Sequence, residues 1–361
     1  MTIAVTPSIE TNAKPVLREM LYTICPVLVA SNVALELGWI HDELARVGAK
    51  PTYLRSALSD TSWPAHYNHA SDRLIRDGGN SPAIWSKADL RPTVLLGLTQ
   101  AQPAGKIVVR ADADIYRVAD LKGRRIALYK SQRNEKIDHR RATTEHGILA
   151  ALALHGLSRA DVELVDIEDA DAHSETLAET PAGIWAQRRS TRQDVHTLES
   201  RALEAGTVDA LYDYSIGVAK KLVETGRFKV IEDLDRYTDW TLRIANAPRT
   251  ISISREFAEA NRDIVVAWLR AAIRAGQWIN ANPEAAADVF FRTTIYADRD
   301  EIAQVLRGYD LVPNLSAQNL AGLAIETKFL RDHRYIVNDV DVNEWADSSY
   351  LDEAHASLRT R

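Results

Sequence analysis

Cys25 is the only cysteine in the 361-residue chain, and its sequence context suits a nucleophile. It follows an apolar run, 20–24, that predicts a short buried strand. Pro26 then opens a helical pattern of apolar residues that ends at Gly38. We therefore expect Cys25 at the N-cap of a helix, where unpaired N–H groups and the helix dipole favour a thiolate. The alternative is an ordinary small, buried apolar residue.

A second group of candidate residues lies between positions 66 and 82. His66 is of the type that sets the protonation of a thiol near neutral pH. Arg76 carries a planar fork that matches two oxygens of a compact anion. The spacing of apolar residues before 77–79 is compatible with a short helix that ends at the glycine pair, and 80–82 predicts a new helix with Ser81 as its cap. Gly79 would allow close backbone approach to an anion at that helix start. The plain alternatives are a solvated histidine, a surface charge and an ordinary turn.

Composition excludes several other chemistries. A net charge of −6 and a pI near 6.0 argue against a nucleic-acid or anionic-membrane surface. A single cysteine excludes an intrachain disulfide and a cysteine-rich metal site. His66 and His69 lie three apart without an obvious third ligand, and glycine-rich phosphate loops are absent, so we expect neither a metal nor an organic cofactor. The polar N-terminus and the lack of long apolar stretches predict a cytoplasmic protein.

The elements that must position these residues alternate between strand and helix. We predict strands at 20–24, 50–54, 94–98, 106–109, 162–166, 208–212 and 228–231, and a turn that leads into a strand within 121–128. Helices are predicted at 147–155, 198–205 and 218–224 among them. This alternation predicts an α/β protein with mostly parallel sheets flanked by helices. A second lobe is expected to begin near Asp120. The chain from Ser254 onwards is expected to be mostly helical, with a packing stripe along 264–279.

Several of these segments carry a family resemblance. The order of elements, with 121–126 (Leu-Lys-Gly-Arg-Arg-Ile) and 206–211 (Gly-Thr-Val-Asp-Ala-Leu), resembles the two-lobed periplasmic binding proteins that carry sulfonates. The closer resemblance is to the 2′-hydroxybiphenyl-2-sulfinate desulfinase family of dibenzothiophene desulfurisation, and it extends over most of the chain. It is carried by 22–26 (Tyr-Thr-Ile-Cys-Pro), His66 ten residues before Arg76, Gly78-Gly79, Pro82, Ser86, 90–91, 95–97 and 120–126.

The resemblance implies a fold and a set of roles. The fold is a type II periplasmic-binding-protein-like one, in which 1–118 and 235–361 form the first lobe with the site, and 119–234 form the second. Cys25 and His66 would be catalytic, and the ligands of the sulfinate would be Arg76, Gly79, Thr23 and Tyr67. The sequence departs from the family, which has Ser, Asn and Phe where this chain has Thr23, Ile24 and Tyr67. The family's aromatic biphenyl pocket has no match that we can assign in the second lobe.

The implied function is hydrolytic C–S cleavage of an aromatic sulfinate with release of sulfite, by a monomer without a cofactor. Two mechanisms stay open: protonation of the ring carbon by the Cys25 thiol, or attack of the thiolate on sulfur. The main rival is a non-catalytic binding protein for a sulfonate or sulfinate. Another is an enzyme of this fold with a different reaction, such as the pyrimidine-synthesising proteins that spend their own histidine. Aromatic residues near the site either stack on the aryl ring or pack in the core; they are Tyr22, Trp63, Tyr67 and Trp85.

Overall fold

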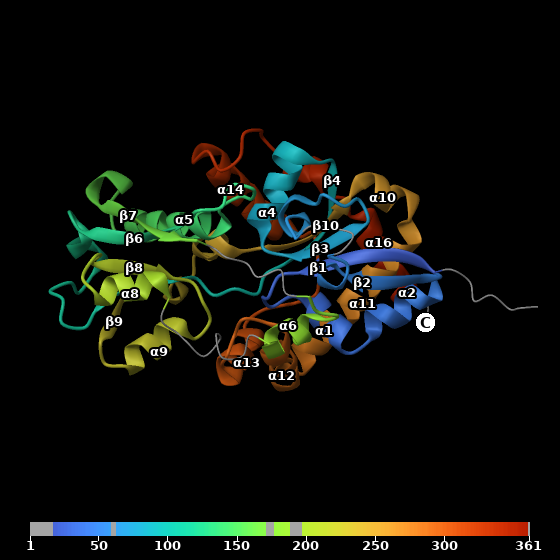
Figure 1. Ribbon diagram of the computed structural model, residues 1–361, viewed down its shortest axis with the longest axis horizontal. Coiled ribbons are helices and arrows are strands. Elements are labelled where there is room, and N and C mark those ends of the chain that lie inside the picture. Colours follow the sequence, from blue (N-terminus) through green and yellow to red (C-terminus); the bar gives the residue numbers. More distant parts are fainter. Residues whose placement is uncertain (1–16, 59–62, 171–176, 188–196, 360–361) are drawn as a thin grey trace, which may run out of the picture.

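The protein is built on two five-stranded sheets, each covered by helices on both faces (Figure 1). The computed structural model describes residues 17–58, 63–170, 177–187 and 197–359. In spatial order, the strands of the first sheet are β2 (Ala49–Tyr53), β1 (Arg18–Ile24), β3 (Leu74–Gly78), β10 (Arg249–Ser254) and β4 (Thr93–Thr99). Those of the second are β7 (Glu163–Asp169), β6 (Arg125–Ser131), β8 (Ala210–Asp213), β5 (Lys106–Arg110) and β9 (Phe228–Asp233).

Each sheet contains four strands that run in one direction and one reversed strand. β10 is antiparallel to β3 and β4, and β5 is antiparallel to β8 and β9. These are the first strands after the chain passes from one sheet to the other, through 100–105 and again through 234–248. The prediction of an α/β fold with mostly parallel sheets is confirmed, and the reversed strands result from the two passages.

The helices divide between the two sheets. Around the first sheet lie α1 (Ala30–Glu36), α2 (Trp39–Arg46), α3 (Ala65–Asn68), α4 (Asn80–Trp85), α10 (Arg255–Ala260), α11 (Arg262–Ala281), α12 (Pro283–Thr293), α13 (Arg299–Arg307), α14 (Ala317–Asp332), α15 (Val342–Trp345) and α16 (Ser349–Arg359). The second sheet packs α5 (His139–Leu154) on one face, and α8 (Leu198–Glu204) and α9 (Val218–Glu224) on the other. Successive side chains of β5 point to opposite faces of the sheet, so both faces are apolar and both pack helices: Ile107 and Val109 face α5, and Val108 faces the opposite side.

The helical stripe at 264–279 has the expected packing role. It belongs to α11, a 20-residue helix whose Trp268 is fully buried in the core of the first sheet. The mostly helical C-terminal part is likewise confirmed, from α10 to α16.

The boundary between the lobes differs from the sequence-based expectation. β5 joins the second sheet, whereas the sequence-based division places its residues in the first lobe. An apolar strand such as 107–109 can pair in either sheet, so its sequence does not say which one it joins. Within the expected second lobe, α6 (Pro181–Gln187) packs against the helices of the first: Ile184 is buried in the same core as α1 and α12 (Figure 1). We therefore keep the two-lobe division as a proposal, with the first passage at 100–105.

Two local predictions near the site are wrong. The helix after Cys25 begins at Ala30, since the chain first turns back at Pro26, where Val27 N–H donates to the Cys25 carbonyl at 2.8 Å. Cys25 is therefore not the N-cap of this helix. The residues before Gly79 form β3, a buried strand between β1 and β10, where a helix was expected. A short apolar run of this kind does not distinguish strand from helix until its partners are known.

Candidate active site

The candidate residues gather at one edge of the first sheet. β1 and β3 are parallel and end there, which places Cys25 just beyond β1 and Gly79 just beyond β3. β10 runs the opposite way and begins at this edge with Arg249. The carboxyl edge of parallel strands is where α/β proteins commonly bind ligands, because the loops that follow the strands converge there.

His66 lies between Cys25 and Thr23. Its Nε2 is 3.6 Å from Cys25 Sγ, and its Nδ1 is 2.6 Å from Thr23 Oγ1. Thr23 is in β1 and Cys25 is the residue after this strand, whereas His66 is in the short helix α3. If the Thr23 hydroxyl donates to Nδ1, then Nε2–H points at sulfur; if it accepts, Nε2 is ready to take the thiol proton. In either tautomer the imidazole can exchange a proton with the thiol.

Arg76 fixes the site from the centre of the sheet. The side chain is only 1% exposed. Its Nε donates to the His66 carbonyl at 2.9 Å, its Nη1 to the Gly79 carbonyl at 2.6 Å, and its Nη2 to Cys25 Sγ at 3.1 Å. A guanidinium that donates to sulfur stabilises a thiolate. Three groups of the site are thus held by one buried cation.

Gly78 leaves room for the thiol. Gly78 is two residues after Arg76 in β3, so it faces the same side of the sheet. A Cβ at Gly78 would overlap both the Sγ and the Cβ of Cys25. The glycine is therefore needed for a reason other than the turn we expected: the Cys25 side chain lies directly over it.

Aromatic rings surround the imidazole. Trp63 stacks on His66 with centroids 4.6 Å apart, and Tyr67 packs edge-on at 4.8 Å. The Arg55 guanidinium lies 3.7 Å above the Trp63 ring. Tyr67 also stacks on His139 at 5.8 Å, and His139 begins α5 beside the second sheet. The ring of Tyr67 therefore bridges the two halves of the molecule, while Trp63 orients His66.

The other aromatic candidates lie away from the thiol chemistry. Tyr22 is buried and stacks on Tyr53, with centroids 5.2 Å apart. Trp85 is partly buried against the hydrophobic clusters that include α3 and α4. Both therefore have the packing role that was the plain alternative.

Burial shapes the electrostatics beneath the site. Burial lowers the pKa of His69 to about 3, with Arg76 acting in the same direction, and Nε2 of this neutral ring lies 3.0 Å from Ser252 Oγ. Burial raises the pKa of Asp77 to about 6, although the guanidiniums of Arg76 and Arg249 oppose the shift. His66 and His69 thus have separate partners. Among the described residues, no group of three or more His, Cys, Asp or Glu side chains could hold a metal ion.

Sequence reasoning did not single out Arg249 or Gln102. Arg249 is 3% exposed, and its Nη2 donates to Gln102 Oε1 at 2.7 Å. Gln102 lies in the first passage between the sheets, and its Nε2 donates to the Tyr214 carbonyl at 2.7 Å. No sequence signal linked these residues to Cys25, because they are more than 75 positions away along the chain.

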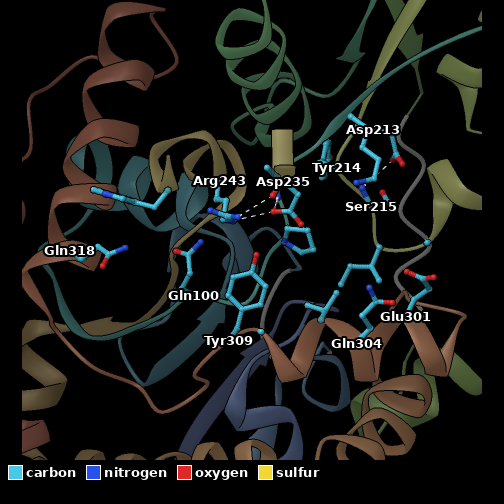
Figure 2. Close-up of a pocket in the computed structure, with 18 residues that line it drawn as sticks. Gln100, Asp213, Tyr214, Ser215, Asp235, Arg243, Glu301, Gln304, Tyr309 and Gln318 are labelled. Atoms are coloured by element: carbon cyan, nitrogen blue, oxygen red, sulfur yellow. Dashed lines mark hydrogen bonds and ion pairs between the residues drawn. The ribbon is translucent and has the colours of Figure 1, made fainter. Parts of the chain in front are cut away.

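Tyr214 also lines a cavity of about 630 Å³. Figure 2 shows Tyr214, Asp235, Arg243 and Tyr309 around it: Tyr214 follows β8, Asp235 and Arg243 lie in the second passage, and Tyr309 follows α13. Arg243 is paired with Asp235 at 3.1 Å. Cys25 does not line this cavity, so the cavity and the thiol are separate features.

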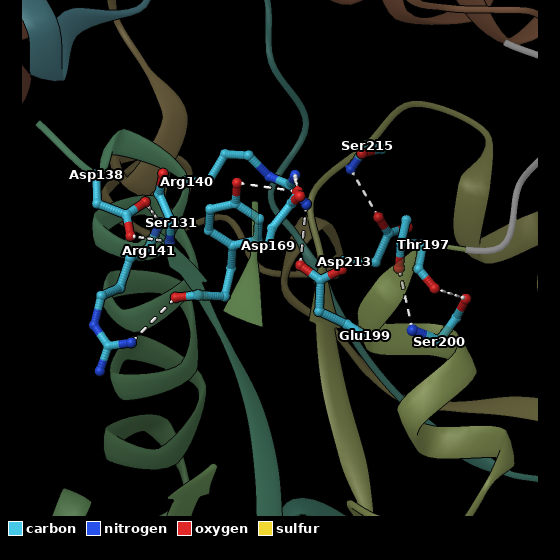
Figure 3. Close-up of polar contacts among 11 residues, drawn as sticks. Ser131, Asp138, Arg140, Arg141, Asp169, Thr197, Glu199, Ser200, Asp213 and Ser215 are labelled. Atoms are coloured by element: carbon cyan, nitrogen blue, oxygen red, sulfur yellow. Dashed lines mark hydrogen bonds and ion pairs between the residues drawn. The ribbon is translucent and has the colours of Figure 1, made fainter. Parts of the chain in front are cut away.

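The second sheet presents a polar cluster at its edge (Figure 3). Arg140 lies 3.7 Å above the ring of Tyr129 and bonds Glu199 at 3.1 Å, with Asp169 at 3.5 Å. Asp138 caps α5 by accepting from Arg141 N–H at 3.1 Å. These interactions fix the start of α5, which carries His139 towards Tyr67.

The structure thus brings together most of the residues selected from the sequence. Cys25, His66, Arg76 and Thr23 are in direct contact, and Gly79 joins them through its carbonyl. Thr23 is fully buried and bonds His66, so its contact is with the imidazole. α4 begins at Asn80 with Gly79 as its N-cap, two residues before Ser81, the cap that the sequence predicts.

Fold and site define a class: a two-lobed, periplasmic-binding-protein-like α/β protein in which a partly buried thiol contacts a buried imidazole and a buried guanidinium. The family model described as "NMT1/THI5 like" matches residues 84–286, which is more than half of the chain. The chain belongs to this NMT1/THI5-like family. Along the residues that the structure describes, no helix has the length and apolar character needed to cross a bilayer.

Comparisons with individual proteins confirm the resemblance. The chain is 26% identical over 358 residues to 2′-hydroxybiphenyl-2-sulfinate desulfinase of Rhodococcus erythropolis, covering 92% of both chains, and the same values hold for the protein of Rhodococcus qingshengii. The solved structure of the desulfurization enzyme DszB matches with a TM-score of 0.74 at 22% identity, covering 94% of this chain and 99% of that one. A putative sulfonate-binding protein, SsuA of Methylobacillus flagellatus, matches with 0.68 at 16% identity, covering 95% and 96%.

Proposed function

We propose that this protein is an aryl sulfinate desulfinase, which cleaves the carbon–sulfur bond of 2′-hydroxybiphenyl-2-sulfinate or a related aromatic sulfinate and releases sulfite. The observation that carries the proposal is the Cys25 thiol held between His66 Nε2 and Arg76 Nη2. The similarity to the desulfinases over 92% of the chain supports the choice of reaction. The net reaction consumes one water: ArSO₂⁻ + H₂O gives ArH + HSO₃⁻.

In the proposed mechanism the Cys25 thiol protonates the ring carbon that bears sulfur. A π electron pair of the ring forms the new C–H bond, the electron pair of the breaking C–S bond then restores the aromatic ring, and SO₂ leaves as a neutral molecule. The thiolate left behind lies 3.1 Å from Arg76 Nη2, which stabilises it. Hydration of SO₂ to HSO₃⁻ releases a proton, and His66 returns a proton to sulfur across the 3.6 Å contact.

The alternative mechanism is covalent. The thiolate attacks the sulfinate sulfur, the aryl group leaves as ArH after protonation, and water then releases bisulfite from the Cys25–SO₂⁻ adduct. This route brings a thiolate to a bound anion, so it requires more positive charge around the sulfinate than the first route. Mass spectrometry of enzyme quenched during turnover separates the two: an adduct on Cys25 heavier by one SO₂ establishes the covalent route.

The positions of the remaining residues suggest their roles. We assign Thr23 to orienting His66, since it is buried and bonds Nδ1 at 2.6 Å. Tyr67 reaches His139 near the second sheet and would contribute to an aryl site between the lobes. Gly79 would approach the sulfinate through its backbone N–H. Closure of the lobes would exclude water while the C–S bond breaks.

The test is sulfite release from 2′-hydroxybiphenyl-2-sulfinate and from smaller aryl sulfinates, with Cys25→Ser in parallel. We expect release by the native protein and loss of release in the variant, with aryl sulfinate binding retained. Release that survives Cys25→Ser would refute the mechanism. The solved DszB cysteine-to-serine variant in complex with biphenyl-2-sulfinic acid supports the choice of this substitution and ligand.

The second candidate function is a non-catalytic binding protein for a sulfonate or sulfinate. The similarity to the sulfonate-binding SsuA in fold favours it. Tight binding of sulfonates without turnover of any sulfinate would establish this function. We also propose a monomer that acts in the cytoplasm, where a single thiol stays reduced; light scattering and cell fractionation test these two points.

A further inference from the structure

Arg249 lies at the same edge of the first sheet as the thiol. It is the first residue of β10, its register partner in β4 is Thr99, and the next residue, Thr250, pairs with Gly78 of β3. The backbone register therefore places Arg249 beside the ends of both neighbouring strands, close to the loop that holds Gly79. A residue in this position reaches the ligand edge of the sheet without belonging to any of its loops.

Gly79 lies between two guanidiniums. Its carbonyl accepts from Arg76 Nη1 at 2.6 Å, and a Cβ built on Gly79 would lie 3.7 Å from Arg249 Nη1. The thiol belongs to the same electrostatic neighbourhood. Burial lowers the pKa of Arg249 and Arg76 acts in the same direction, while Cys25 raises the pKa of Arg249. The two cations therefore flank the backbone that is proposed to meet the sulfinate.

The two cations have different hydrogen-bond partners. Arg76 uses Nη2 to hold Cys25 Sγ and uses other N–H groups to hold two backbone carbonyls. Arg249 Nη2 donates to the amide of Gln102, which is neutral and orients the guanidinium without cancelling its charge. Asp77 interacts electrostatically with both guanidiniums, each of which favours its ionised form. Taken together, Arg76, Arg249 and an ionised Asp77 carry one net positive charge, which a bound sulfinate would balance.

We propose that Arg249 is the second anion-binding guanidinium of the site, and that Gln102 is the positioning residue that orients it. Arg76 then serves the thiol and the backbone as well as the sulfinate, and Arg249 adds a second guanidinium for the sulfinate oxygens and for the sulfite that forms from them. Gln102 also donates to the Tyr214 carbonyl beyond β8 at 2.7 Å, so the orientation of Arg249 is linked to the second sheet. This inference rests on the proposed function for the identity of the anion.

The experiment measures binding by calorimetry in the Cys25→Ser background, with biphenyl-2-sulfinate and its neutral methyl sulfone as probes. We expect Arg249→Gln to weaken sulfinate binding by about tenfold to about a hundredfold, as expected for one charge-assisted hydrogen bond. The affinity for the neutral sulfone should change less than about twofold, because it lacks the charge that Arg249 recognises. Arg243→Gln, at an arginine paired with Asp235, is the matched control and should leave both affinities unchanged.

Two further variants keep the test informative if Arg249→Gln fails to fold. Arg249→Lys keeps the charge and loses the planar fork, so sulfinate binding should fall less than in Arg249→Gln. Gln102→Glu keeps Arg249 and places a carboxylate where the amide oxygen now lies, 2.7 Å from Nη2. It should weaken sulfinate binding while the neutral sulfone binds as before, an effect that a merely structural role of Gln102 would not produce.

Different results separate this proposal from the function on which it rests. Sulfinate binding without turnover in the native protein refutes the desulfinase proposal and leaves the Arg249 comparison intact. Unchanged sulfinate affinity in folded Arg249→Gln or in Gln102→Glu overturns the role of Arg249, whatever the turnover. Equal losses for sulfinate and sulfone also overturn it, since they indicate a structural effect. Failure of the native protein to bind any aryl sulfinate or sulfonate overturns the anion site as a whole.

Discussion

Thr23→Val tests the role of the imidazole directly. Valine has almost the shape of threonine, so the substitution removes the hydroxyl 2.6 Å from His66 Nδ1 and leaves the volume of the site nearly unchanged. If Thr23 fixes the tautomer and ring orientation of His66, the variant should return protons to the thiol more slowly. Thr23→Ser is the matched control, because it keeps the hydroxyl and removes only a methyl group.

The structure sets the size of the effect. Thr23 is fully buried and His66 is 5% exposed, so water does not readily replace the lost hydrogen bond. Removing one partner of a buried hydrogen bond costs about 1–3 kcal/mol. If this difference appears entirely in the transition state, kcat falls by about fivefold to about 150-fold. Any part of this free energy that the contact already contributes to the folded ground state would instead lower the free energy of unfolding and leave kcat unchanged.

The assay is sulfite release as a function of pH, combined with denaturant unfolding of the same preparations. We expect Thr23→Val to lower kcat and to shift the pH dependence of turnover, while Thr23→Ser stays within about threefold of the native enzyme, corresponding to less than about 1 kcal/mol. A Thr23→Val variant with native kcat and a native pH profile would refute the argument that Thr23 acts through His66. A loss of stability alone, with unchanged kcat, would reduce Thr23 to a packing residue.

Three further predictions concern the framework of the site. Gly78→Ala should abolish sulfite release and lower the unfolding free energy by about 1–3 kcal/mol, since its Cβ would overlap Cys25; native activity in this variant would contradict that placement. Trp63→Ala should cost about 3–5 kcal/mol in urea unfolding and also lower kcat, because the ring stacks on His66. Because the pKa of Asp77 is raised to about 6, its carboxyl group keeps the proton in the folded protein at pH values where the unfolded chain has lost it, so the free energy of unfolding falls by about 3 kcal/mol as the pH rises from about 4 to about 6. Asp77→Asn should lack this decrease in unfolding experiments across that pH range. The same pH dependence in Asp77→Asn as in the native protein would refute the prediction.

Periodicity was sufficient to predict only part of the structure around the site, because it did not identify β3 or β10 and it placed the start of the helix after Cys25 too early. Strands β1 and β4 and the long helix α11 have apolar patterns that only one structure fits well. Cys25 also stood out, because a lone thiol after a buried strand is chemically distinctive. The contacts between Cys25, His66 and Arg76 could not be derived from spacing. They were expected through the family resemblance, and the geometry of the sheet accounts for them.

Two features could not have been found in the sequence for a physical reason. The sequence of β3 is equally compatible with the end of a helix. Only a strand places Arg76 and Gly78 on the same face, next to Cys25. Arg249 joins the site through antiparallel pairing of β10 with β3, a contact between segments about 170 residues apart. Such pairings depend on the whole chain, and neither partner carries a local signal for the other.

The arrangement separates the chemistry of the thiol from the choice of ligand. The groups that act on Cys25 are fixed by the first sheet, because Arg76 holds two backbone carbonyls as well as the sulfur. The groups that approach from the other side, such as His139 on α5 and the Tyr214 carbonyl after β8, belong to elements of the second sheet. Under the proposed function, substitutions there would change the space offered to an aryl ring and leave the thiol environment intact. The first sheet would then supply the reactive thiol and the anion site, and the elements of the second sheet would supply the aryl site.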